Sequence, residues 1–69
     1  MEALKVGDLT TCVVLNVNSS LAQVRARDMH GIIRGSGGSR ATVGEHLKIR
    51  VVDFDGDGTR FIAVRLDGV

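Results

Sequence analysis

The chain contains 69 residues with a formal net charge of +1, a single cysteine, and no proline, tryptophan or tyrosine. A chain of this length forms one domain, residues 1–69, with a thin core, and the single cysteine excludes an internal disulfide. No apolar run is long enough for a signal peptide or a membrane span, so we expect a soluble cytoplasmic protein with no membrane contact.

Three stretches in the first half of the chain have the composition of β-strands. Residues 9–17 are rich in threonine, valine and leucine, and residues 21–27 alternate small apolar residues with polar ones. A turn at residues 28–31 then leads into a short third strand at residues 32–34. The small apolar residues of the second strand suit the inside of a tightly curved barrel.

The fourth strand lies within residues 43–55 and begins on a Val43-Gly44-Glu45 turn. That turn repeats the Val6-Gly7-Asp8 turn before the first strand. An Asp-Gly hairpin turn at residues 55–58 leads into a fifth strand at residues 59–66. The second half of the chain therefore predicts a hairpin of two further strands.

Residues 35–39, Gly-Ser-Gly-Gly-Ser, predict a flexible loop, and they also resemble an engineered linker. We expect no helix of useful length. Five strands of this length predict an all-β fold, a small five-stranded barrel. The register of the fifth strand stays open, because Phe61 and Ala63 form one apolar face and Ile62, Val64 and Leu66 form the other.

Positive charge is concentrated in the middle of the chain. Between Gln23 and Arg50 six cations outnumber two acids, whereas acids outnumber cations after Arg50. An uneven distribution of this kind indicates an anionic partner that meets one face of the barrel. The alternative is that these charges only solvate the outward positions of the strands.

Several short motifs resemble the OB-fold RNA-binding domain of the ribosomal protein S-one type. They are the two Val-Gly-acid turns, Gly31-Ile32-Ile33, residues 51–55 and Arg60-Phe61. The layout is also similar to the small bacterial OB-fold translation initiation factor. The resemblance implies a role in RNA binding or translation, with the ligand on the outer face of the second and third strands.

The chain departs from that family where RNA bases are stacked. The family's aromatic and histidine positions are occupied here by Ser20, Gln23 and Arg34, so two stacking platforms are lost. We therefore expect phosphate contacts by arginines, with little sequence preference and steep salt dependence. The predicted nucleic-acid-binding residues are Gln23, Arg25, Arg27, Arg34, Arg40, Lys48 and Arg50.

No motif indicates an enzyme, a cofactor or a metal site. The acids of residues 53–58 imitate the start of a calcium loop, but Arg60 and Val64 stand where that loop needs an apolar residue and a glutamate. We interpret the run as a hairpin turn with solvated acids. His30 and His46 are isolated and read as surface residues, and Cys12 reads as a core residue.

The sequence favours a non-catalytic module that binds single-stranded or structured RNA, with single-stranded DNA as a second ligand. One alternative is a protein-interaction or scaffold module that has lost its stacking residues, in which case the partner is a protein. The other is an engineered minimal barrel. The oligomeric state stays open.

Overall fold

The chain forms five strands, in which buried and exposed residues largely alternate, and one helical turn. The computed structural model describes residues 4–66, except for the side chains of Ser36 and Gly37. The elements, in chain order, are β1 (Leu9–Val17), β2 (Leu21–Ala26), β3 (Met29–Arg34), α1 (Ser36–Ser39), β4 (His46–Asp55) and β5 (Arg60–Arg65).

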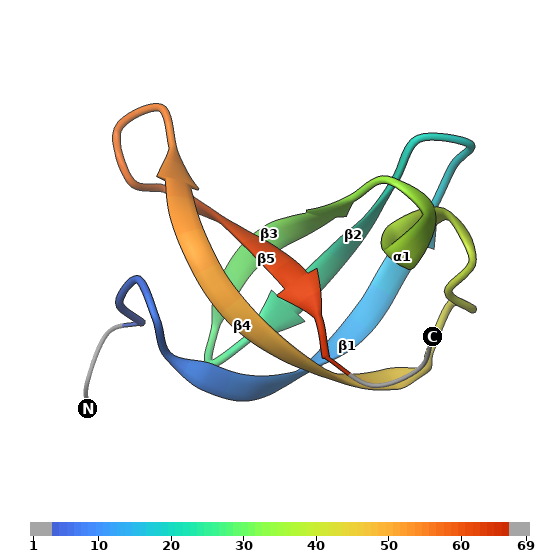
Figure 1. Ribbon diagram of the computed structural model, residues 1–69, viewed down its shortest axis with the longest axis horizontal. Coiled ribbons are helices and arrows are strands. Elements are labelled where there is room, and N and C mark those ends of the chain that lie inside the picture. Colours follow the sequence, from blue (N-terminus) through green and yellow to red (C-terminus); the bar gives the residue numbers. More distant parts are fainter. Residues whose placement is uncertain (1–3, 67–69) are drawn as a thin grey trace.

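The strands close into a single barrel in the order β1-β2-β3-β5-β4 (Figure 1). Every neighbouring pair is antiparallel except β3 and β5, which run parallel. Closure leaves no strand with an unpaired edge. This is the five-stranded Greek-key barrel of the OB-fold class, and it confirms the predicted all-β fold.

The interior is filled by alternate residues of all five strands. Ala22, Val24 and Ala26 face inward from β2, as their alternation predicts. In β5 the open question of register is settled: Phe61 and Ala63 are buried, whereas Val64 is exposed.

Gly31 lies opposite Phe61 in the parallel ladder. A Cβ at Gly31 would overlap the Phe61 ring, so the largest fully buried side chain occupies space that glycine leaves open. The expected turn at residues 28–31 is therefore wrong, because this glycine belongs to a strand.

The turn between β2 and β3 instead consists of Arg27 and Asp28, which both have positive φ (52° and 65°). Two-residue hairpin loops favour this geometry because it matches the twist of the flanking strands. As a result β2 ends at Ala26, one residue earlier than expected, and β3 begins at Met29 instead of residue 32. The correction moves His30 from a turn to the outer face of a strand.

A helical turn stands where the sequence predicts a Gly/Ser loop without a helix. In α1 the amides of Gly38 and Ser39 both donate to the carbonyl oxygen of Gly35, over 3.1 and 2.9 Å. The turn packs against β2, β3 and β5 at one end of the barrel (Figure 1). A single turn of four residues agrees with the expectation of no helix of useful length, while the flexibility of the segment stays a prediction.

Gly38 explains part of that glycine-rich composition. A Cβ at this position would overlap the carbonyl oxygen of Ile33 and lie 2.7 Å from the backbone nitrogen of Ala22. Only glycine lets α1 approach the barrel backbone this closely. Gly38 is therefore needed for packing, whereas an engineered linker would not need glycine at any particular position.

The two Val-Gly-acid turns use the same hydrogen bonds. In the second turn the Glu45 amide donates to the Thr42 carbonyl over 2.9 Å, and the Thr42 amide donates to Glu45 Oε1 over 3.0 Å. In the first turn the Asp8 amide donates to the Lys5 carbonyl over 3.0 Å, and the Lys5 amide donates to Asp8 Oδ2 over 2.9 Å. Each acid therefore closes its own turn through both backbone and side chain.

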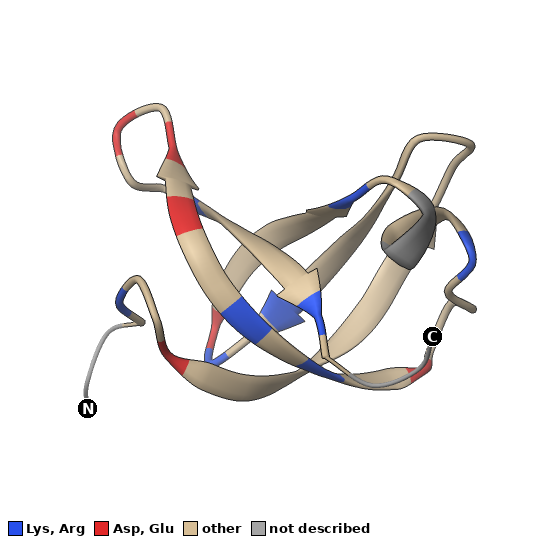
Figure 2. Cartoon of the chain, viewed as in Figure 1, with Lys and Arg blue, Asp and Glu red and all other residues tan. Residues whose placement is uncertain are grey.

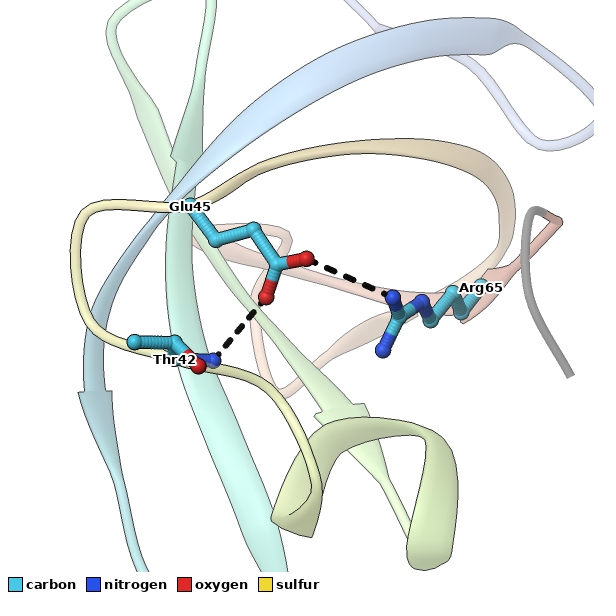
Figure 3. A network of polar contacts seen from close by, with 3 residues as sticks. All are labelled: Thr42, Glu45 and Arg65. Atoms are coloured by element: carbon cyan, nitrogen blue, oxygen red, sulfur yellow. Dashed lines mark hydrogen bonds and ion pairs between the residues drawn. The ribbon is translucent and has the colours of Figure 1, made fainter.

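Glu45 has one further contact, a 3.5 Å ion pair between its Oε2 atom and Arg65 (Figure 3). This pair ties the second turn to the end of β5. Because both side chains are partly exposed, its contribution to stability is small, about 0–1 kcal/mol.

Each turn also extends the ladder between β1 and β4. Gly7 donates to the Val51 carbonyl over 2.7 Å, and Gly44 donates to the Val14 carbonyl over 2.8 Å. The register then shifts just beyond the same two valines, between Val14 and Asn16 in β1 and between Val51 and Asp53 in β4. These bulges bend both long strands at equivalent points, which helps the barrel to close.

Candidate nucleic-acid interface

A depression of about 390 Å³ lies on the outer face of β2 and β3. Leu15 encloses it on the side of β1. Thr59, at the end of the β4–β5 turn, and Arg60, the first residue of β5, enclose it on the opposite side. In five-stranded barrels of this class the face of the second and third strands, with the adjoining loops, is the usual ligand surface. The lining residues are Leu15, Gln23, Val24, His30, Gly31, Ile32, Thr59 and Arg60.

Ile32 forms an apolar floor. It points outward between His30 and Arg34 in the alternation of β3, yet only 7% of it is exposed. Gln23 lies opposite it on β2, and Leu15 lines the depression from β1. An apolar floor with a polar amide at its margin suits a planar ring that carries hydrogen-bonding groups.

A row of nitrogen-bearing side chains crosses the depression at one end. Arg25 pairs with His30 between β2 and β3, and His30 pairs with Arg60 between β3 and β5. Paired residues point to the same side of the sheet, and adjacent strands are about 4.8 Å apart, so the three side chains are immediate neighbours. All three are exposed, and neither arginine makes an ion pair among residues 4–66. We call Arg25, His30 and Arg60 the cross-strand row.

The predicted site residues are only partly brought together. Gln23 lines the depression and Arg25 borders it. Arg27 sits in the β2–β3 turn, Arg34 pairs with Leu21 away from the depression, and Arg40 follows α1.

The two predicted cations of β4 lie elsewhere on the barrel. Lys48 pairs with Thr11 and Arg50 pairs with Leu9, both on β1. In Figure 2 the basic positions are accordingly spread over several sides of the barrel, and acidic positions lie in the β4–β5 hairpin as well as at turns elsewhere.

Four residues that line the depression are not among the residues predicted from the sequence: His30, Ile32, Thr59 and Arg60. His30 was assigned to a turn and read as an isolated surface residue; it is exposed, but it borders the depression. Arg60 was counted with the acidic end of the chain. The signal that could have found them is the alternation of residues 29–34, which becomes visible once the turn is placed at Arg27 and Asp28.

The acidic run forms a hairpin turn, as predicted. The Gly58 amide donates to the Asp55 carbonyl over 3.0 Å, and Asp57 Oδ1 accepts from the Thr59 amide over 3.3 Å. Within residues 4–66, no three side chains of His, Cys, Asp or Glu are grouped to hold a metal ion. Asp55 pairs with Arg60 across β4 and β5, so negative charge bounds the cross-strand row on that side.

Two other residues singled out from the sequence lie where it placed them. Cys12 is buried in the core, and His46 is exposed at the start of β4. In the described part of the chain, no helix has the length and apolar character needed to cross a membrane.

Comparison with known proteins identifies a similar fold. No protein-family model and no curated protein sequence matches the chain. Among solved structures it is similar to GSP13 from Bacillus subtilis, determined in solution, with a TM-score of 0.76 and 18% sequence identity. The match covers 90% of this chain and 55% of GSP13, so the chain spans about half the length of that protein. At this identity the likeness shows a shared fold.

Proposed function

We propose that this chain is a non-catalytic module of the S-one type that binds single-stranded RNA in the depression on β2 and β3. The observation that carries the proposal is the combination of an apolar floor at Ile32 with the cross-strand row Arg25, His30 and Arg60. The fold shared with GSP13 and the sequence resemblance to the S-one domain support the same surface.

The chemistry of the row fits a nucleotide. Histidine is one of the side chains on which unstacked RNA bases are stacked, so His30 supplies a ring in a site that otherwise lacks aromatic residues. Arg25 and Arg60 flank it and are free of ion pairs among the described residues, so both can meet phosphates. Gln23 offers a donor and an acceptor to the edge of a base that rests on Ile32.

The test is a titration of the ¹⁵N-labelled chain with short single-stranded RNA at low and high salt, in parallel with DNA of the same sequence. We expect shifts of the Gln23, His30 and Ile32 amides, and affinity that falls as salt rises. Equal affinity for RNA and DNA would mean that the 2′-hydroxyl is not read. Absence of binding at low salt would overturn the proposal.

Substitutions distinguish the contribution of the cross-strand row to RNA affinity from that of an arginine outside the depression. His30→Ala should cost about 1–3 kcal/mol of binding free energy if the ring stacks a base. Arg60→Ala should reduce the salt slope by about 0.7 for the single phosphate contact that is lost. Arg40→Ala is the matched control, an exposed arginine outside the depression, and should leave the affinity unchanged. Equal weakening by the two arginine variants would contradict the proposed site.

A further inference from the structure

The outer face of β4 carries aliphatic side chains and cations together. Leu9 pairs with Arg50 between β1 and β4, and Arg50 pairs with Val64 between β4 and β5. The Leu66 amide donates to the Lys48 carbonyl over 2.9 Å, which places Leu66 beside the same strand. We call these five residues the β4 face.

The aliphatic members of this face are open to solvent. Leu9 is 58% exposed, Leu66 47% and Val64 45%. Apolar residues gathered on the surface, rather than scattered singly, mark interaction sites on soluble proteins. The five residues include no acid, although acidic residues are nearly as numerous as basic ones in the chain.

This face is separate from the depression. In the closed order β1-β2-β3-β5-β4, strand β4 has β1 and β5 as neighbours, so its outer surface is turned away from β2 and β3. No lining residue of the depression belongs to the β4 face. A ligand on one surface leaves the other free.

We propose that the β4 face binds a second protein through a segment that combines carboxylates with apolar side chains. Burial of Lys48 and Arg50 in an apolar contact is favourable only if the partner brings the opposite charge to each. The aliphatic residues beside them on β1 and β5 require apolar groups on the partner, which a nucleic-acid backbone does not provide.

The geometry also limits how the partner binds. A closed barrel has no free edge, so the partner cannot add a strand and must use side-chain contacts. A second copy docked symmetrically through the same face would bring Lys48 and Arg50 close to their own counterparts, and this repulsion argues against a twofold dimer. An amphipathic acidic helix satisfies both constraints.

The probe is a synthetic helical peptide that carries leucine and glutamate on one face, added to the ¹⁵N-labelled chain. We expect amide shifts at Leu9, Lys48, Arg50 and Val64, and none at Gln23 and Ile32. A peptide with lysine in place of glutamate should cause no shifts. Failure of the glutamate peptide to shift the β4 face at the highest soluble concentration would overturn the proposal, as would equal shifts with the lysine peptide.

Charge reversal gives the matched comparison. The Lys48→Glu and Arg50→Glu double variant should bind the glutamate peptide on the order of tenfold more weakly. The control is Arg40→Glu, an exposed arginine outside both surfaces, which should bind the peptide like the unmodified chain. Unchanged peptide binding by the double variant would contradict the inference.

RNA titration of the same double variant keeps this inference distinct from the proposed function. We expect RNA still to shift Gln23 and Ile32, with a loss of binding free energy no more than twice that of Arg40→Glu, because the double variant reverses two charges and the control reverses one. RNA shifts on the β4 face would assign that face to nucleic acid instead. Shifts of the β4 face that grow with protein concentration alone would assign it to a second copy of the chain.

Discussion

The two halves of the barrel, residues 5–26 and 42–65, share a turn, a strand, a bulge and a returning strand in the same order. The likeness extends to single hydrogen bonds beyond each bulge. The Val17 amide donates to Asn16 Oδ1 over 2.9 Å, and the Phe54 amide donates to Asp53 Oδ1 over 2.8 Å. The same backbone frame is therefore built twice, and the differences lie in the side chains that it carries.

Two of the differences between the halves concern the size of a core residue and the charge of an outward one. Inside the barrel, Ala22 of β2 occupies the place that Phe61 has in β5. Outside, Arg25 of β2 occupies the place of Val64 in β5. Arg25 belongs to the cross-strand row and Val64 to the β4 face, so two equivalent outward positions of the frame serve the two different surfaces. Turns and bulges specify the frame, and outward positions are free to specify function.

The substitution Phe61→Ala gives β5 the same inward residue that β2 has at Ala22, and it is the change with the largest expected effect. Loss of this fully buried ring should lower the free energy of unfolding by about 3–5 kcal/mol, because the rigid barrel closes only partly over the cavity. Urea denaturation followed by far-UV circular dichroism measures the loss. Phe54→Ala is the matched control and should cost less, because Phe54 is only half-buried. Equal losses would contradict this account of the core.

The helical turn α1 packs against Ala22 of the first half, and Gly38→Ala tests that contact. The added methyl group would press on backbone atoms of Ile33 and Ala22, which cannot rotate away as a side chain can. We expect a loss of about 1–3 kcal/mol in urea denaturation. Thr42→Ala, at an exposed position, should stay within about 0.5 kcal/mol. A neutral Gly38→Ala would favour the linker interpretation.

The two turns can be compared by removing each acid in turn. Asp8→Ala and Glu45→Ala should each cost about 0.5–1.5 kcal/mol, because each loses a hydrogen bond from a backbone amide. Glu45→Ala should cost slightly more, since the contact with Arg65 is lost as well. Added salt screens that ion pair, so the difference between the variants should shrink in high-salt thermal melts. A difference that grows with salt would contradict this reading.

The smallest effect is expected for Val64→Arg, which gives β5 the residue that β2 has at the equivalent position. Val64 is exposed, so the free energy of unfolding should change by no more than about 0.5 kcal/mol. Equilibrium denaturation tests this directly. A decrease in the free energy of unfolding well above that value would show that outward-facing residues also stabilise the barrel.

Much of the fold follows from local pattern. The bounds of β1 and the inward residues of β2 come from alternation and β-propensity alone. The register of β5 does not, because both of its faces are apolar, and only the space at Gly31 selects Phe61 for the interior. The helical turn α1 consists of serine and glycine, which do not favour a helix, and its position depends on contact with the barrel backbone at Gly38.

The site was harder to predict than the fold. Arg25 and His30 are close in the chain but face each other only if the β2–β3 turn is placed correctly, and Arg60 is distant in the chain and reaches them only through the parallel β3–β5 pairing. Counting charge along the sequence placed Arg60 with the acids near it, although its side chain borders the predicted face. Linear charge does not describe a surface that is assembled across strands.

The parallel pairing of β3 with β5 also affects how the chain reaches its native state. The β1–β2–β3 meander and the β4–β5 hairpin can each form from residues near one another in sequence, but neither can close the barrel alone. Closure needs the distant pairings β1–β4 and β3–β5 together, and such non-local contacts slow folding. We expect one rate-limiting docking step between two preformed units, so that circularly joining the termini accelerates folding in stopped-flow experiments while shortening the β4–β5 turn does not.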